Sequence, residues 1–425
     1  MARKSWSNPL SRFLGRLGPG LITGASDDDP SGIGSFTQAG AAHGYATLWT
    51  ALFLLPLMIV VQHISAKIGM VSGRGLASVL KVNYSRWVLY PAVICLVGAN
   101  TINAGTDILA IAAAINLFFP VPILALVLPI SVAIVVLQVW GSYRLIVKVF
   151  KWLTLALFAY VIAAFLARPD WRAVLGATFV PPISFDADYL MTIVALLGTS
   201  ISPYLFFWQA SEEVEEEKCI VGRRTVAERE GATDKELRDE KIDTVTGMAL
   251  SQLVMYFVIL SAASTLHAAG RTNIGSASQA AEALAPLAGN LASLLFSFGI
   301  IGAGLLGVPV LTGAAAYAVA ETFDWNEGLD EKPRDAKKFY VVIALSTLVG
   351  ITVGLIGIDP ITALFYTAVI NGVVAPPLLV LIMLIANNKK IMGGRVNGIF
   401  ANVVGWCAAA LMFAAAIGMF ATWNQ

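Results

Sequence analysis

The feature that most constrains the fold is a series of apolar stretches, each near twenty residues long, that recur along the whole chain. A helix of about 20 residues crosses the roughly 30 Å hydrocarbon layer of a bilayer, so each stretch predicts a transmembrane helix. Only 13% of the 425 residues are charged and 57% are hydrophobic, which leaves too little charge to cover a soluble surface. We therefore expect an integral membrane protein.

We expect one all-α polytopic transmembrane domain, residues 1–425, with about eleven spans. Ten-residue segments of alternating polarity, which are typical of transmembrane barrels, do not occur in the sequence. The expected spans are 17–39, 46–69, 88–116, 121–140, 147–167, 188–211, 246–268, 288–320, 339–358, 361–386 and 399–421.

Orientation follows from Lys and Arg, which stay on the cytoplasmic side during insertion. With the N-terminus inside, all but three of the 28 Lys and Arg residues are cytoplasmic, the exceptions being Arg168, Arg172 and Arg271. This predicts a bacterial-type inner (plasma) membrane protein with its C-terminus outside. The charged stretch 212–243 is expected to be a solvated cytoplasmic loop with some helix, or alternatively an acidic vestibule that gathers cations near the inner mouth.

Several classes of function are disfavoured by composition. The net charge of +1 gives no indication of nucleic-acid binding, and the cysteines are too isolated for a disulfide framework or a zinc site. No nucleophile, base and orienting residue stand together, so we expect neither an enzyme nor a cofactor. The expected partners are the lipid bilayer and a transported ion, with no obligatory protein partner.

Two spans carry a proline after a run of small polar residues: Pro30 in GASDDDPSGIG and Pro203 in GTSISPYLFF. Proline removes a backbone donor and clashes with the preceding turn, so both helices are expected to break near the bilayer centre. Paired breaks in two five-helix halves, 17–167 and 188–386, indicate an inverted-repeat transporter with a midplane site. The helix at 399–421 lies outside this repeat.

The first break carries three consecutive acids, Asp27, Asp28 and Asp29. Each aspartate at the centre of a span costs about 2.5 to 3.5 kcal/mol on insertion scales, so the three must face a polar cavity or a cation. We expect one or two to line a site while another caps the second half-helix. The alternative is that all three are caps or loop residues at a membrane edge. Unwinding is expected to be helped by Gly24, Gly32 and Gly34.

Oxygen donors with no His or Cys nearby favour a hard cation such as Mg²⁺ or Mn²⁺. Asp107 is the only acid in its span and is expected either to face the permeation or proton path or to be paired structurally. Its candidate partners are Asn100, Asn103 and Arg144.

Five fragments in order resemble the natural resistance-associated macrophage protein (Nramp) family of divalent metal transporters: GPGLITGASDDDP, VVQHISAKIGMVSGRGL, AINLFF, GSYRLIVK and KKIMGGRVN. The resemblance implies a LeuT-type inverted repeat of five plus five helices and one extra helix. It places the family's metal-binding aspartate, asparagine and methionine on Asp29, Gly32 and Ser202 respectively. The backbone carbonyl ligands fall on Ser26 and Thr199.

The departures from the family pattern shift the expected ion. Without the thioether at Ser202 the preference for transition metals should weaken, and the smaller Gly32 and Ser202 should leave a wider site. The chain is similar in this to the Nramp-related magnesium transporters. Tyr204 replaces the family's histidine, and of the two family acids only Asp107 remains, so weak or absent proton coupling is expected. Asn371 lies near the family's glutamine in span ten.

We expect a secondary-type carrier that moves a divalent cation, Mg²⁺ or Mn²⁺ above all, by alternating access, with Asp29, Asp28 and Ser202 as metal ligands. The alternative is a carrier of this fold for another solute, such as an organic cation or amine. Cation–π contacts to such a solute would come from four aromatic residues, Tyr204, Phe206, Phe207 and Trp208. The other interpretation of these residues is that they pack against lipid.

Overall fold

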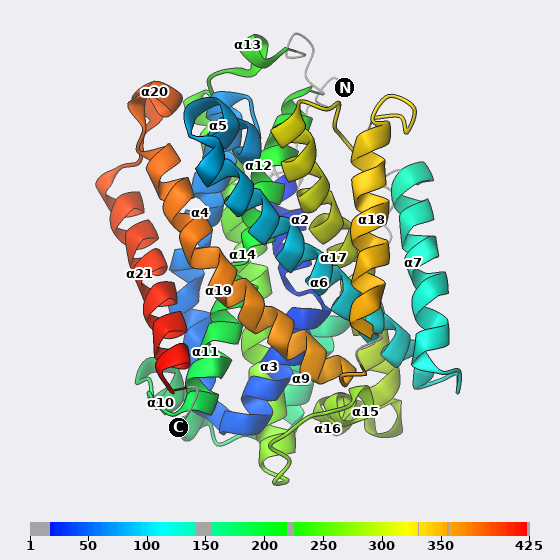
Figure 1. Cartoon of the computed structure of the whole chain (residues 1–425). Coiled ribbons are helices and arrows are strands. Elements are labelled where there is room, and N and C mark those ends of the chain that lie inside the picture. The colour runs from blue at the N-terminus through cyan, green and yellow to red at the C-terminus, as the bar shows by residue number, and fades with distance from the viewer. Residues whose placement is uncertain (1–17, 142–154, 219–224, 330, 355–356, 423–425) are drawn as a thin grey trace, which may run out of the picture.

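The computed structural model describes residues 18–141, 155–218, 225–329, 331–354 and 357–422. All regular secondary structure in these ranges is helical, as predicted. Long helices run between two ends of the molecule (Figure 1). One end, here named the N-terminal end, carries α5 (Leu76–Asn83), α13 (Val226–Arg229) and α20 (Lys389–Met392). The opposite end carries α10 (Trp171–Phe179), α15 (Ala277–Ala281) and α16 (Ala285–Ala288).

Eight helical segments of the described residues are long and apolar enough to cross a membrane. They are α4 (Trp49–Ser72), α6 (Arg86–Asn116), α7 (Ile123–Trp140), α11–α12 (Ala187–Lys218), α14 with its π-helical end (Asp234–His267), α15–α17 (Ala277–Phe323), α19 (Pro360–Ala386) and α21 (Ile399–Thr422).

Three other expected spans also correspond to helices of the described residues. The first is divided into α2 (Pro19–Asp27) and α3 (Pro30–His43), and the ninth is α18 (Lys337–Gly354). The fifth, 147–167, lies partly outside the described residues, and its described end holds a short 3-10 turn and α9 (Ala159–Leu166).

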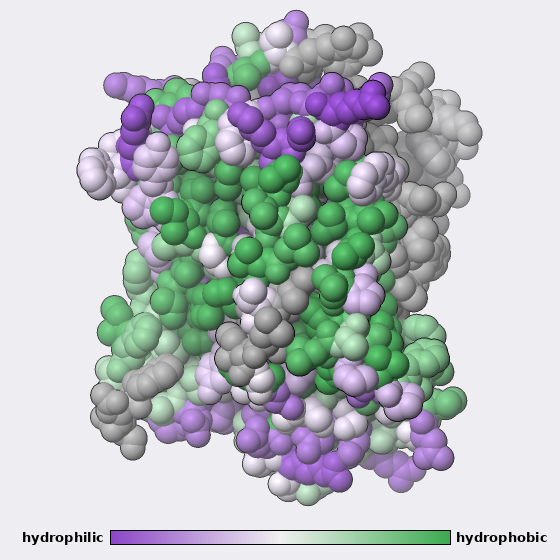
Figure 2. Space-filling model, turned by 45° about the vertical axis from the view of Figure 1, so that its right-hand side comes forward, coloured by the Kyte–Doolittle hydropathy of each residue, from purple (hydrophilic) through white to green (hydrophobic). Residues whose placement is uncertain are grey.

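A hydrophobic belt surrounds the helices between two polar ends. Figure 2 shows this belt as a broad green band between purple ends on the face that it presents. On α7 the exposed side chains Leu124, Leu128, Val132 and Val136 recur once per turn, so one whole face of this helix is apolar and unburied. A face of this kind is stable only in lipid, in agreement with the predicted membrane protein.

Both predicted helix breaks are present. α11 (Ala187–Ser200) is followed by α12 (Pro203–Lys218), and α2 is followed by α3, with proline at the first position of each second half-helix. Proline suits this position because its missing N–H has no partner there in any helix. Other prolines, such as Pro56 in α4 and Pro309 in α17, lie inside unbroken helices.

Glycines allow backbone-to-backbone contact where the helices cross. A Cβ placed on Gly198 of α11 would lie 2.1 Å from the carbonyl oxygen of Ala368 in α19, and one on Gly372 would lie 2.2 Å from that of Val194. Small residues are the usual means of helix association in lipid, where hydrophobicity alone does not distinguish one apolar face from another.

The charged stretch 212–243 differs from the solvated loop that the sequence predicts. α12 continues to Lys218 and α14 (Asp234–Ala262) begins before the membrane, so much of the stretch is helical. Glu213, Glu240 and Asp243 are buried. The expected solvation was wrong for these residues because protein groups satisfy their carboxylates. Asp243 accepts from the Gly20 N–H of α2, whereas Glu213 and Glu240 accept from side chains one turn away on their own helices.

The close contact of α11 with α19 generates a prediction about stability. Gly198→Ala places a methyl group against a backbone oxygen that no rotamer change can relieve, so it should lower unfolding stability by about 1–3 kcal/mol. Gly98→Ala in α6, which meets nothing within 4 Å, is the matched control. Thermal unfolding of the purified protein in detergent measures both, and equal midpoints would contradict the packing described.

Candidate functional site

The break between α2 and α3 is only two residues long. α2 ends at Asp27, Asp28 leaves the helical conformation, and Asp29 is the N-cap of α3 with φ −67° and ψ 170°. Its side chain accepts a hydrogen bond from the backbone N–H of Gly32 at 2.8 Å. Asp29 therefore satisfies one of the free donors at the start of a helix that begins inside the protein.

The carboxylate of Asp29 is surrounded by donors from three helices. Oδ1 also accepts from Ser31 Oγ at 2.6 Å, while Oδ2 accepts from Asn103 Nδ2 of α6 at 3.1 Å and lies 3.3 Å from the Tyr204 hydroxyl of α12. The Asp29 side chain is 1% exposed. This carboxylate is thus the point at which the first break, the second break and α6 meet.

Asp107 of α6 faces the same place. The side chain is completely buried and faces the backbone N–H of Ser31, but neither carboxylate oxygen has a hydrogen-bond partner of normal geometry. A Cβ built on Gly307 of α17 would lie 2.9 Å from Cβ of Asp29 and 3.8 Å from Oδ2 of Asp107. The two acids therefore lie against the surface of α17 at Gly307, where the side chain is missing.

Asp27 and Asp28 point to a different helix. Ser251 Oγ of α14 lies 2.5 Å from Asp27 Oδ2 and 3.4 Å from Asp28 Oδ1, and both aspartates are buried. The structure thus separates Asp28, which the sequence groups with Asp29 as a ligand, from the polar partners of Asp29. The three consecutive side chains diverge because the backbone leaves the helical conformation at Asp28 (φ −83°, ψ 44°) and is extended at Asp29.

The predicted ligands at the second break form hydrogen bonds within the protein. Ser202 Oγ is 2.6 Å from the carbonyl oxygen of Gly198 and 2.7 Å from that of Thr199. The Tyr204 hydroxyl donates to the carbonyl oxygen of Ser26 at 3.0 Å. Ser26, Thr199, Ser202 and Tyr204 therefore lie around the two breaks as expected, and their oxygens are engaged with one another.

The remaining predicted residues are placed as follows. Gly32 and Pro30 lie in the first turn of α3, and Pro203 begins α12. Asn371 of α19 is buried, with no hydrogen-bond partner for either amide atom. Arg144, one candidate partner of Asp107, lies outside the described residues. Asn100, another, donates instead to the carbonyl oxygen of Leu311 at 3.0 Å.

The aromatic run of α12 does not face lipid. Phe206 and Phe207 pack into one hydrophobic cluster and Trp208 into another, all with side chains at most 2% exposed. The lipid-facing interpretation of these residues was wrong because α12 lies in the interior of the bundle rather than at its edge.

α2 is docked against α14 through glycines. A Cβ on Gly24 would lie 2.3 Å from the carbonyl carbon of Gly247, and one on Gly247 would lie 2.2 Å from the carbonyl oxygen of Gly20. Asp243 of α14 accepts from the N–H groups of Gly20 at 2.7 Å and Leu21 at 3.0 Å. A carboxylate at a helix N-terminus is favoured by the helix dipole, so Asp243 fixes the start of α2.

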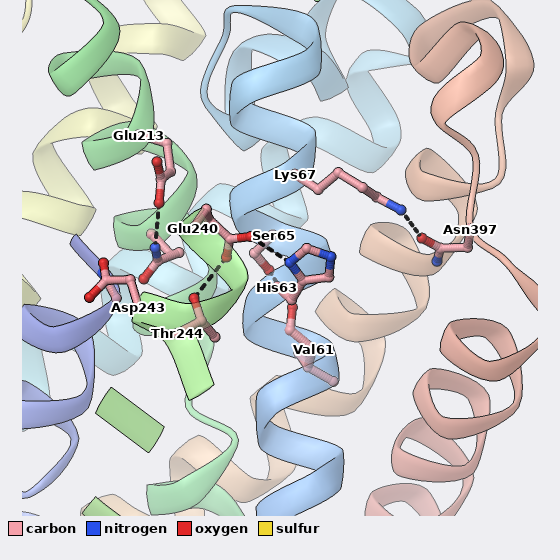
Figure 3. A network of polar contacts seen from close by, with 11 residues as sticks. Val61, His63, Ser65, Lys67, Glu213, Glu240, Asp243, Thr244 and Asn397 are labelled. Atoms are coloured by element: carbon pink, nitrogen blue, oxygen red, sulfur yellow. Dashed lines mark hydrogen bonds and ion pairs between the residues drawn. The ribbon is translucent and has the colours of Figure 1, made fainter. Parts of the chain in front are cut away.

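A chain of polar side chains joins α2 to α12 beside this contact. Thr23 Oγ1 donates to Gln209 Oε1 at 2.5 Å, and Gln209 Nε2 donates to Glu213 Oε1 at 2.8 Å. Figure 3 shows Glu213 and Asp243 close to one another at the side of α14.

The same figure shows how side chains of α4 contact α14 and the residues just before α21. His63 Nδ1 lies 2.5 Å from Glu240 Oε2, whose other oxygen accepts from Thr244 Oγ1 at 2.7 Å. Lys67 Nζ donates to Asn397 Oδ1 at 2.5 Å. α14 is therefore tied to α4 on one side and contacts the half-helix α2 on the other.

Three functional candidates were missed in the sequence: Asn103 as a partner of Asp29, Gly307, and Asp243. Asn103 had been considered only as a partner of Asp107. One signal for Asn103 was available, because it lies four residues before Asp107 and so on the same helix face. Nothing in the local sequence distinguishes Gly307 from its neighbouring glycines.

The geometry can now be compared with known proteins. A family model described as natural resistance-associated macrophage protein-like (Nramp) matches residues 20–422. The chain belongs to this family. The divalent metal cation transporter MntH of Deinococcus radiodurans is 26% identical over 95% of this chain and 89% of the relative. This membership confirms the resemblance seen in the sequence and identifies the family as transporters rather than enzymes.

Solved structures share the fold. A manganese transporter of Eremococcus coleocola superposes with a TM-score of 0.76 at 16% identity, covering 99% of this chain and 89% of that one. A nucleobase-cation-symport-1 family transporter in a closed conformation gives 0.58 at 14% identity, covering 96% and 93%. The predicted architecture of an inverted-repeat transporter with two broken helices is thereby confirmed.

The cap on α2 leads to a prediction about accessibility. Asp243→Ala removes a charged acceptor from two backbone donors, each such bond being worth about 1.5–3 kcal/mol. Undocking of α2 should therefore become at least about tenfold more frequent, since 1.4 kcal/mol is a factor of ten. The measurement is the rate of thiol labelling at Thr23→Cys, a buried position, with the three native cysteines replaced.

Asp234→Ala is the matched control for that experiment. Asp234 lies on the same helix but is exposed and paired with Arg395 at the surface, so its removal should leave labelling unchanged. Identical labelling rates for Asp243→Ala and the parent protein would show that Asp243 does not hold α2.

Proposed function

We propose that this chain carries a divalent cation across the membrane and binds it at Asp29. The observation that supports this most directly is a buried carboxylate at a helix break, faced by a second carboxylate, Asp107. None of the ion pairs among the described residues involves either acid. Uncompensated acids at membrane depth are expensive, and a cation bound between them offsets that cost.

Mg²⁺ and Mn²⁺ are the proposed substrates. Every described polar group within hydrogen-bonding distance of the Asp29 carboxylate is an oxygen or an amide, and none of them is sulfur or imidazole. Hard oxygen donors suit Mg²⁺ and Mn²⁺. The relatives named as divalent metal cation transporters and the manganese transporter with the same fold support the ion class.

Alternating access is the proposed mechanism, with α2 as a moving part. α2 contacts α14 through glycine backbones, the Asp243 cap and the hydrogen bond from Ser251 to Asp27, so its movement would break mainly polar and backbone contacts of small residues. We place the N-terminal end in the cytoplasm, so detachment of α2 opens the site inward. Proton coupling is proposed to be weak or absent, because Tyr204 stands where the family has histidine and is a hydroxyl donor there.

The alternative substrate, an organic cation or amine, receives no support from the structure. Its aromatic contacts were to come from residues around Trp208, and Phe206, Phe207 and Trp208 are packed inside hydrophobic clusters. The divalent cation is therefore the single function proposed.

Asp29→Asn tests the proposed site. The amide has nearly the same shape but no charge, so uptake of Mg²⁺ and Mn²⁺ into proteoliposomes should fall to the level of protein-free vesicles. Asp335→Asn, which removes an exposed acid outside the helices, should transport normally. Metal-sensitive dyes inside the vesicles measure uptake, and a pH dye should show no accompanying acidification. Unchanged uptake by Asp29→Asn would overturn the proposal.

Ser202→Met tests the basis of selectivity. A thioether at the second break adds a soft ligand, so uptake of Cd²⁺ should increase relative to uptake of Mg²⁺. Ser202→Ala removes the hydroxyl without adding sulfur and should leave the Cd²⁺ to Mg²⁺ ratio near that of the parent. If Ser202→Met and Ser202→Ala give the same ratio, position 202 does not contact the ion.

A further inference from the structure

We propose that Asp107 is a direct second ligand of the transported cation, so that the ion is held between two carboxylates from different helices. This inference rests on the proposed function and names a ligand of the same site. It differs from the two roles that the sequence suggested for Asp107, which were a place on a proton or permeation path and a structural pairing with a neighbouring polar residue.

The first argument is convergence. Asp29 is fixed at the break by Ser31 and Gly32, and Asp107 reaches the same place from α6. The α17 backbone at Gly307 lies against both side chains, because a Cβ there would be 2.9 Å from Cβ of Asp29 and 3.8 Å from Oδ2 of Asp107. Gly304, one turn away, lets α17 approach Pro30 in the same manner.

The second argument is that no described residue forms a hydrogen bond of normal geometry with Asp107. Both of its oxygens are buried, and the backbone N–H of Ser31 faces them without completing such a bond. Asn100 donates to a backbone carbonyl of α17, and Asn103 donates to Asp29 rather than to Asp107. A fully buried carboxylate left unsatisfied costs several kcal/mol, which a structural role does not repay. A bound cation satisfies it.

A third observation is independent of the acids. Asn103 is completely buried, and its Oδ1 has no hydrogen-bond partner while its Nδ2 faces Asp29. Rotation of the amide by half a turn presents an oxygen ligand in place of the donor. The Tyr204 hydroxyl has one proton and two acceptors, the Ser26 carbonyl at 3.0 Å and Asp29 Oδ2 at 3.3 Å. When it donates to Ser26, a lone pair of its oxygen is available to a cation beside Asp29.

The charge of the two carboxylates determines which ions such a site would favour. Two carboxylates neutralise a dication, whereas a single carboxylate with neutral ligands leaves a net charge of about +1 inside the membrane. Two anionic oxygens, an amide oxygen and a hydroxyl form a hard ligand set without sulfur. The acid that could have relayed a proton is instead used to hold the ion, which agrees with the weak proton coupling proposed above.

Equilibrium binding separates this proposal from a proton relay. Mn²⁺ is titrated into purified full-length protein, and free Mn²⁺ is followed by electron paramagnetic resonance at two pH values. Loss of an outer-shell partner weakens metal binding by about 10–100-fold, so loss of a ligand in Asp107→Asn should weaken it by more than about 100-fold at both pH values. A relay role predicts unchanged binding with altered pH dependence of transport only.

Matched variants keep the outcome interpretable. Thr106→Val alters the adjacent residue, which contacts Thr367 of α19, and should bind Mn²⁺ normally. The double variant Asp107→Asn with Asn103→Asp restores the second carboxylate one turn away and should recover part of the lost affinity. Normal Mn²⁺ binding by Asp107→Asn, or no recovery in the folded double variant, would overturn the inference.

The two proposals fail differently in this experiment. If Asp29→Asn binds Mn²⁺ normally, the proposed site is wrong. If Asp29→Asn loses binding while Asp107→Asn retains it, the site stands and only the role of Asp107 is refuted. Thermal unfolding of each variant shows whether lost binding reflects lost folding.

Discussion

The carboxylate of Asp29 at the start of α3 is the interaction on which the rest of the site depends. A helix that begins inside a membrane protein presents free N–H groups where no water can satisfy them, and Asp29 accepts from one of them at Gly32. The same carboxylate accepts from Asn103 and faces Tyr204, so it also fixes the distance from the first break to α6 and α12. Folding and the proposed ion binding therefore use the same carboxylate oxygens, and an isosteric Asn can keep part of the cap while removing the charge.

Glycines then allow the neighbouring helices to pack closely around Asp29. Apolar helices in lipid have little hydrophobic reason to choose one partner over another, so close contacts come from positions that lack a side chain. Gly304 and Gly307 place α17 against Pro30 and Asp29, and Gly24 with Gly247 places α2 against α14. The first pair closes the wall of the site, whereas the second brings two backbones together without side chains between them, which suits the movement of α2 in the proposed mechanism.

Hydropathy and proline chemistry made the architecture predictable from the sequence. The orientation of the side chains could not be predicted in this way. Pro30 and Pro203 could be identified as break points because short polar residues precede them, whereas Pro56 and Pro309 follow apolar residues and stay within helices. The division of the aspartates between α6 and α14 depends on the backbone torsions of Asp28, which tertiary packing determines. The burial of Glu213 and Asp243 could not be predicted either. A charged stretch has the same composition whether water or protein groups donate hydrogen bonds to its carboxylates.

The charges at the two ends of α2 connect occupancy of the site with its position. At the first turn of α2, Asp243 lies where the helix dipole favours an anion, so this contact stabilises the packing of α2 on α14. At the other end Asp27 and Asp28 lie where the dipole disfavours one, and Ser251 supplies a single proton for both. A cation bound at the break, as proposed, would offset that unfavourable end. The proposed function therefore requires the docked state of α2 to be more stable with the ion bound than without it, because the acids at the C-terminal end of α2 are then compensated.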